Sequence, residues 1–205
     1  MQSLPRQPFI QRLRINILRL LFVLLLPLLL FVRPVIAENG LGGTLMEEAG
    51  ILLVIIAVLG RFWAVMYSGH NKNRVVVQHG PYSMCRHPLY LFSTIGVAGF
   101  GLMVGSLLLT LLITVLAGVV LAATARSEEA HMRSLFGPDY DAYAARVPMI
   151  WPNPVLFQTP HEITVRVQAL RVNLQDAVVF LSFIPMAALL QWLKHADYVT
   201  TFPLY

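Results

Sequence analysis

Two polar stretches of this chain carry side chains that are able to bind or transform a small molecule. The first contains Arg86 and His87 in immediate succession, and the second, farther along the chain, contains Glu128 and Glu129. A planar guanidinium, an imidazole ring and two carboxylates can hold carboxylate, phosphate, hydroxyl or ammonium groups through charge-assisted hydrogen bonds. These residue types indicate a site for a polar ligand, provided that the fold brings the two stretches together.

The composition places these stretches in a membrane protein. Hydrophobic residues make up 57% of the 205 residues and charged residues only 12%. A soluble domain carries about 25% charged residues, so this chain lacks the polar surface to face water all round. This composition excludes a mainly disordered chain and a nucleic-acid-binding module. The single cysteine excludes a disulfide framework. The 15 basic against 10 acidic residues favour anionic lipids or anionic substrates as partners.

The chain contains four apolar runs that are candidates for crossing a bilayer, which needs about 20 residues. They are about Ile15–Ala37, about Leu45–Tyr67, the stretch His87–Ala125, and Ala177–Leu193. The third contains no Asp, Glu, Lys or Arg and would extend over about 58 Å as one helix, so we expect a hairpin with its turn within Gly99–Ser106. The fourth is short and contains Pro185, which leaves a short span and an interfacial helix as alternatives.

The first apolar run has a second interpretation. Arginines precede it, and Val35-Ile36-Ala37 resembles the small-residue cleavage site of a secretory signal peptide. Arg33 lies close before that site, which favours a retained helix.

The distribution of positive charge predicts the orientation. The N-terminal arm, the loop around residues 68–88 and the segment after Arg126 are rich in arginine, whereas residues 37–49 hold only acidic charges. The positive-inside rule therefore assigns the loop 68–88 and everything after Arg126 to the cytoplasm. We expect an all-α integral membrane protein of about four to five transmembrane helices, with a helical hairpin and a cytoplasmic cofactor pocket.

Three regions follow from this organisation. Residues 1–67 form two N-terminal transmembrane helices, residues 68–152 form the core that contains the hairpin, and residues 153–205 form a connector and an apolar helix. Because the hairpin returns to the side on which it begins, its two ends should bring Arg86 and His87 beside Glu128 and Glu129.

Each polar residue also has a purely structural explanation. Pro88 suits the first turn of a helix, so His87 could be a cap residue. Glu128 and Glu129 could form a solvated helix face, and tyrosines are common at membrane interfaces. The order and spacing of the whole set is less well explained in this way.

That order resembles a known family. Between Val76 and Pro152 the chain is similar to isoprenylcysteine carboxyl methyltransferases and to related phospholipid methyltransferases of membranes. The matching pieces are Gly80-x-Tyr82, Arg86-His87-Pro88-x-Tyr90, Glu128-Glu129, Phe136-Gly137-x-x-Tyr140-x-x-Tyr143 and Val147-Pro148.

The resemblance implies methyl transfer from S-adenosylmethionine to a lipidic or amphipathic acceptor, with membrane lipids as further partners and no nucleic acid. It implies catalytic roles for Arg86 and Glu129. The residues implied in cofactor binding are Val76, Val77, Tyr82, His87, Pro88, Leu89, Tyr90 and Glu128, and those implied in substrate binding are Arg126, Tyr140 and Tyr143.

Two positions depart from the family pattern. Phe92 stands where relatives commonly have glycine, so a bulky ring is expected to reshape the lipid-facing part of the site. Thr124 stands where relatives often have arginine, and Arg126 lies about 200° away around a helix and cannot simply replace it. If that arginine binds the acid of the substrate in prenylcysteine enzymes, a different substrate is favoured here, and an isoprenylcysteine-like carboxylate and a lipid headgroup both remain candidate acceptors.

The need for a base depends on the acceptor. An anionic oxygen needs none, whereas an amine or a thiol must lose a proton, and Glu129 or His131 is then the candidate base. The histidines form no short ligand pair, so we predict no metal site. A lone Cys85 near an apolar helix is more often inert packing than a nucleophile.

Two other functions remain open from the sequence. Nicotinamide-dependent membrane reductases of the sterol-reductase type have a similar tyrosine and Val-Pro ending, although their bundles are much larger. A scaffold or small transporter is the non-catalytic alternative, but transporters usually carry ionisable groups near the bilayer midplane, and the predicted hairpin has none. The sequence does not determine an oligomeric state.

Overall fold

The computed structural model describes residues 20, 23, 27, 31–34, 40–69, 75–195 and 202–204. Nearly all of these residues that are in regular structure are helical, which confirms the predicted all-α class apart from two three-residue strands. The elements are β1 Val32–Pro34, α2 Leu41–Ser68, α3 Pro81–Met84, α4 Pro88–Val104, α5 Leu107–Phe136, α6 Pro138–Arg146, a 3-10 turn η1 Pro154–Leu156, α7 Val167–Leu181, α8 Phe183–His195 and β2 Phe202–Leu204.

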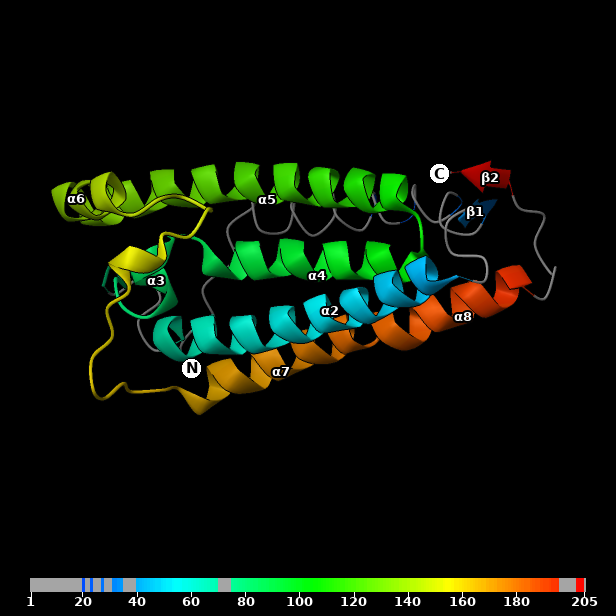
Figure 1. The fold of residues 1–205 in the computed structure, drawn as a ribbon. Coiled ribbons are helices and arrows are strands. Elements are labelled where there is room, and N and C mark those ends of the chain that lie inside the picture. Colours follow the sequence, from blue (N-terminus) through cyan, green and yellow to red (C-terminus); the bar gives the residue numbers. More distant parts are fainter. Residues whose placement is uncertain are drawn as a thin grey trace, which may run out of the picture.

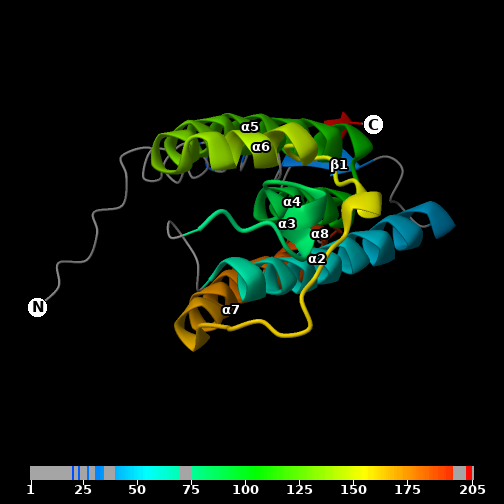
Figure 2. The ribbon, with the colours of Figure 1, turned by 90° about the vertical axis from the view of Figure 1, so that its left-hand side faces the viewer.

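Helix α4 lies at the centre of the bundle, between α5 on one side and α2 on the other (Figures 1 and 2). It packs against α2 at very short range: a Cβ atom built on Gly50 would lie 2.6 Å from the carbonyl oxygen of Gly99. Only glycine allows two helix backbones to approach this closely. The largest apolar cluster, which includes Val54, Phe100 and Met103, lies around this contact.

The predicted hairpin is confirmed, and its turn lies at the last two residues of the expected stretch. Gly105 adopts φ 88° and ends α4, and the Ser106 hydroxyl accepts a hydrogen bond from the Leu109 amide at the start of α5. Gly99 and Gly101 are helical residues with close neighbours, so they serve packing and not the turn.

Helices α7 and α8 contain the last apolar run, for which the sequence left a short span and an interfacial helix as alternatives. Together, Val167–Lys194 is long and apolar enough to cross a membrane, as are α2 and α5, whereas α4 is a shorter apolar helix. The pair runs along α2 and α4 from the α3 end of the bundle to the turn between α4 and α5 (Figure 1). There the Gln191 amide donates a hydrogen bond to the Met103 carbonyl.

This course corrects one part of the predicted topology. The sequence placed everything after Arg126 on one side, but α8 ends at the opposite end of the bundle, because the last apolar run is part of a full-length helical pair. The short elements α3, α6 and η1 gather at the end where α7 begins (Figure 1).

Strands β1 and β2 form a two-stranded parallel pair, in which Val32 lies opposite Phe202. Each strand contains a proline, and the residue before a proline favours an extended backbone. The first predicted span, 15–37, lies mostly outside the described residues, and its residues 32–34 are strand and not helix.

Candidate active site

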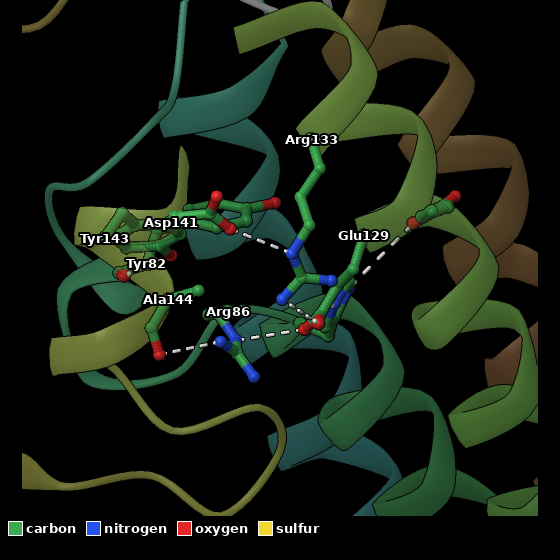
Figure 3. Close-up of polar contacts among 9 residues, drawn as sticks. Tyr82, Arg86, Glu129, Arg133, Asp141, Tyr143 and Ala144 are labelled. Carbon is green, nitrogen blue, oxygen red and sulfur yellow. Dashed lines mark hydrogen bonds and ion pairs between the residues drawn. The ribbon is translucent and has the colours of Figure 1, made fainter. Parts of the chain in front are cut away.

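The two polar stretches meet where α4 begins and α5 nears its end. Nε of Arg86 lies 3.0 Å from Oε1 of Glu129, and the two side chains are 12% and 7% exposed. Helix α5, with 30 residues, is much longer than α4, with 17, so its last turns extend beyond the first residue of α4. Glu129 on one of these turns therefore reaches Arg86, as the sequence predicted (Figure 3).

His87 lies between the two carboxylates of α5. Its Nε2 is 3.3 Å from Oε1 of Glu129, and its Nδ1 is 3.9 Å from Oε2 of Glu128. The imidazole also stacks on the ring of Tyr90, with the ring centroids 5.5 Å apart and an interplanar angle of 11°. Burial lowers the pKa of His87 below its ordinary value, although Glu128 and Glu129 act in the opposite direction.

Backbone hydrogen bonds hold the Arg86-His87 segment in place. The amide of Arg86 donates to the carbonyl of Pro148 at 2.9 Å, and the amide of His87 donates to Met149 at 3.1 Å. Nη1 of Arg86 donates to the carbonyl of Ala144, at 2.8 Å, near the end of α6 (Figure 3). These contacts give the Val147-Pro148 motif a structural role, because it supplies an acceptor to the segment that carries the histidine.

Tyr140 and Tyr143 are buried, and Tyr143 is hydrogen-bonded to the segment that precedes Arg86. The Tyr143 hydroxyl donates to the carbonyl of Tyr82 at 2.8 Å, and the two α6 rings pack edge to face with centroids 5.9 Å apart. Burial raises the pKa of Tyr140 to about 12 and raises that of Tyr143 as well, so both hydroxyls stay protonated. These observed contacts are structural, and the predicted contact with substrate stays a prediction.

Arg133 is a member of the cluster that the sequence reasoning missed. Its Nη2 lies 3.5 Å from Oε2 of Glu129, and its Nε donates to Asp141 at 3.0 Å (Figure 3). Its guanidinium also lies over the ring of Tyr140. Glu129 and Arg133 are four residues apart on α5, which is the spacing of a helical ion pair. That spacing could have revealed the contact with Glu129, but not the contact with Asp141 on another helix.

The remaining predicted residues divide by exposure. Val76 packs against the cluster of Tyr140, Tyr143 and Val147, and Val77, Tyr82, Leu89 and Tyr90 are half-buried. Pro88 is fully buried. Arg126 is exposed on α5. Glu128 is 36% exposed, in contrast to its buried neighbour Glu129.

Cys85 is buried, and its pKa is raised to about 12 by burial, so the thiol stays protonated. This environment agrees with a packing role. Across residues 40–69 and 75–195, no three His, Cys, Asp or Glu side chains gather closely enough to hold a metal ion.

The two departures from the family pattern have distinct surroundings. Phe92 fills space between α4 and α2, because a Cβ atom on Gly60 would lie 2.2 Å from its ring. Thr124 is 6% exposed, and its hydroxyl donates to the carbonyl of Val120 on its own helix. The expectation that Phe92 reshapes a lipid-facing pocket stays a prediction. The ring occupies the space that a side chain at position 60 of α2 would need.

Comparison with known proteins now identifies the family. The family model of phospholipid methyltransferases matches residues 41–139, from the start of α2 into α6. A protein-S-isoprenylcysteine O-methyltransferase of Schizosaccharomyces pombe is 31% identical over 87 residues, which are 42% of this chain and 37% of that protein. This match places residues 41–139 in the phospholipid methyltransferase family. The resemblance drawn from Arg86-His87-Pro88 and Glu128-Glu129 is confirmed, and the family consists of membrane methyltransferases.

Two bacterial relatives are similar to this protein over most of the chain. The nickel-cobalt-cadmium resistance protein NccN of Alcaligenes xylosoxydans xylosoxydans is 32% identical over 98% of this chain and 93% of its own length. The cobalt-zinc-cadmium resistance protein CzcN of Cupriavidus metallidurans is 34% identical over 84% of this chain and 79% of its own length. No solved structure matches the chain significantly.

Proposed function

We propose that this membrane protein transfers a methyl group from S-adenosylmethionine to a lipidic or amphipathic acceptor, at the cytoplasmic surface of the membrane. The observation that carries the proposal is the contact between Arg86-His87 at the start of α4 and Glu128-Glu129 near the end of α5. It joins the two motifs of the family at one end of the bundle. The three apolar helices of spanning length support a position of that end at a membrane surface.

The side chains around His87 have the chemistry that S-adenosylmethionine would need from its binding site. Glu128 is half-exposed and approaches His87 only at 3.9 Å, so its oxygens can accept hydrogen bonds from ribose hydroxyls or from an ammonium group. The stacked rings of His87 and Tyr90 offer flat faces to a purine. Backbone groups near Val76 and Val77, with Tyr82, Pro88 and Leu89, complete the set that we assign to the cofactor.

The cofactor supplies an activated methyl group on a sulfonium, so the protein contributes chiefly positioning and electrostatics. Glu129 faces Arg86, His87 and Arg133, so both of its carboxylate oxygens are engaged in contacts within the protein. We therefore assign Glu129 as a positioning residue for Arg86 and His87. Nη2 of Arg86 makes no hydrogen bond within the described part of the chain, and it is the donor that we assign to an anionic group of cofactor or acceptor.

Ligand binding to the detergent-purified full-length protein tests this function. We expect saturable binding of S-adenosylmethionine by calorimetry, and at least about a tenfold loss of affinity in Glu128→Gln, the cost of one or two charge-assisted hydrogen bonds. Ser134→Ala, an exposed position on the same helix, serves as the matched control. Binding of reduced nicotinamide cofactor without binding of S-adenosylmethionine would instead support the reductase alternative.

The relatives' names support a physiological context for the methyl transfer. Since the similarity to NccN covers nearly all of this chain, we infer that methylation by this protein contributes to resistance against nickel, cobalt or cadmium. A sensitive bacterial host that expresses the wild type should grow at higher metal concentrations than one that expresses Glu128→Gln at equal membrane levels. Equal growth of the two would argue against this role.

A further inference from the structure

A second polar cluster lies among α2, α4 and α7, away from the contacts of Glu129. Nη1 of Arg61 donates to the Ser93 hydroxyl at 2.7 Å, and Nη2 pairs with Oδ2 of Asp176 at 2.5 Å. The guanidinium also lies over the ring of Phe180, 5.3 Å from its centroid. The proposed methyl transfer uses none of these four residues, and α7 lies beyond the residues 41–139 that match the family model.

This cluster lies within the spanning helices and not at their ends. Arg61 precedes the last residue of α2, Ser68, by about two helical turns, and Asp176 lies more than two turns inside α7. Ionisable side chains inside spanning helices are costly and are therefore functional candidates. The pair is unequal in exposure, since the side chain of Arg61 is 14% exposed and that of Asp176 is 52% exposed.

Asn173 provides an independent observation on the same face of α7. It lies three residues before Asp176, it is 3% exposed, and neither its Oδ1 nor its Nδ2 has a hydrogen-bond partner in the part of the chain that the structure describes. This face packs on α2, because a Cβ atom on Gly69 would lie 2.5 Å from that of Ala169. A buried amide without a partner is unfavourable, and a ligand that bonds it would remove that cost.

The cluster is also connected to the proposed cofactor site. The Ser93 hydroxyl donates to the carbonyl of Leu89, one turn nearer to His87 on α4. Helix α3, which carries Tyr82, also packs against α2, which carries Arg61. An amphiphile that enters from the bilayer beside α7 would therefore meet Arg61 before it reaches the residues around His87.

We propose that Arg61 and Asn173 form a binding site for the acidic headgroup of a membrane amphiphile, with Ser93 orienting the Arg61 guanidinium and Asp176 as the counter-ion of the empty site. The planar guanidinium matches a phosphate or carboxylate group, and its Nη2 can bind such a group in place of Asp176 when Asp176 turns away. The half-exposed Asp176 can do so at small cost, whereas Arg61 is held by α4. The assignment of the bound amphiphile as the methyl acceptor rests on the proposed function, but the binding site itself does not.

Spin-labelled lipids test the site without any methyl transfer. The full-length protein is reconstituted in phosphatidylcholine vesicles that contain a trace of spin-labelled phosphatidic acid or spin-labelled phosphatidylcholine, and the motionally restricted fraction is measured. We expect a preference of at least about tenfold for phosphatidic acid, the effect of one charge-assisted hydrogen bond. Arg61→Gln should abolish this preference, and Arg171→Gln, an exposed arginine on α7, should leave it in place.

A second variant keeps the test decisive if Arg61→Gln does not fold. Asp176→Asn removes the competing carboxylate and should increase the preference for phosphatidic acid, whereas a purely structural ion pair predicts no increase and a loss of stability. An equal loss in Arg61→Gln and Arg171→Gln would reduce the effect to general surface charge and overturn the proposal. Displacement of the labelled lipid by excess inorganic phosphate would retain an oxyanion site but overturn its assignment to a lipid headgroup.

Failure of the lipid-binding proposal can be distinguished from failure of the proposed methyl transfer. Glu128→Gln should lose affinity for S-adenosylmethionine and keep the lipid preference, whereas Arg61→Gln should do the reverse. Loss of both properties in Arg61→Gln, with the protein still folded, would mean that the cluster supports the fold of the cofactor site and is no separate site.

Discussion

Glu128 and Glu129 are neighbours in the chain but have opposite environments. Glu129 points into the protein, where it faces Arg86, His87 and Arg133, and its side chain is 7% exposed. Glu128 lies about 100° farther round the helix, where its side chain is 36% exposed. Two identical carboxylates therefore take two roles: Glu129 holds the site together, and Glu128 remains available to a ligand.

Replacement of Glu129 tests this division of roles. Glu129→Gln leaves Arg86 buried without its counter-charge, and the loss of one partner from a buried ion pair typically costs about 3 kcal/mol. We expect a clear fall in the unfolding temperature in detergent, as well as loss of S-adenosylmethionine binding. Glu128→Gln is the matched control and should unfold at the wild-type temperature. If the two variants were equally stable, Glu129 would not be the structural centre of the cluster.

The pH dependence of stability follows from His87. Burial lowers the pKa of His87 below the ordinary 6.5. The charge of Arg86 also lowers this pKa, whereas Glu128 and Glu129 raise it. Below about pH 6.5 the unfolded chain therefore takes up a proton that the folded protein resists, so stability decreases as the pH falls, by at most about 1.4 kcal/mol per pH unit. Thermal unfolding between about pH 7.5 and about pH 5 should record this decrease, and His87→Gln should reduce it. A pH profile unchanged by the substitution would show that other groups cause it.

At the scale of the elements, close packing of α2 on α4 decides where the site residues lie. Since α4 packs closely on α2 at Gly50–Gly99 and on α5 at Gly101–Thr110, the position of its first residues is fixed relative to both helices. The polar segment before Pro88 is then held by the carbonyl groups of Pro148 and Met149. The site thus depends on helix packing at a distance as well as on its own hydrogen bonds.

Substitution of one glycine tests this dependence. In Gly50→Val the new side chain would overlap the Gly99 carbonyl and Met103, and overpacking of this kind costs about 1–3 kcal/mol. We expect a lower unfolding temperature and weaker cofactor binding. The control is Gly118→Ala on α5, whose nearest neighbour, the Thr94 methyl group, lies 3.9 Å from the added Cβ. Gly118→Ala should be neutral or slightly stabilising, and an equal loss in both variants would contradict the packing argument.

The elements also show what the sequence could and could not predict. The absence of charge between His87 and Ala125 predicted the hairpin, because an uncharged stretch of that length must fold back within one bilayer. The same glycine-rich pattern could not separate a turn at Gly105 from a packing contact at Gly99, since glycine serves both. The pairing of Arg61 with Asp176 joins residues 115 positions apart. No local spacing records such a contact, because it depends on how α7 lies against α2.

At the scale of the whole molecule, polar function and positive charge gather at one end. The candidate site, α6 and the start of α7 lie there, with Arg86, Arg126, Arg133, Arg146 and Arg166. The start of α2, with Glu47 and Glu48, lies at the other end beside the turn between α4 and α5 (Figure 1). By the positive-inside rule, the site end should face the cytoplasm.

Thiol labelling from the two sides of the membrane tests this orientation. The native Cys85 is 1% exposed, so it should contribute little background in the folded protein. Val155, 91% exposed near the site, and Leu41, 85% exposed at the start of α2, are suitable positions for single introduced cysteines. A membrane-impermeant maleimide added to intact cells should label Leu41→Cys and spare Val155→Cys, and inverted vesicles should give the opposite pattern. Labelling of Val155→Cys in intact cells would place the site outside, where the cytoplasmic supply of S-adenosylmethionine does not reach, and would count against the proposed methyl transfer as well as the orientation.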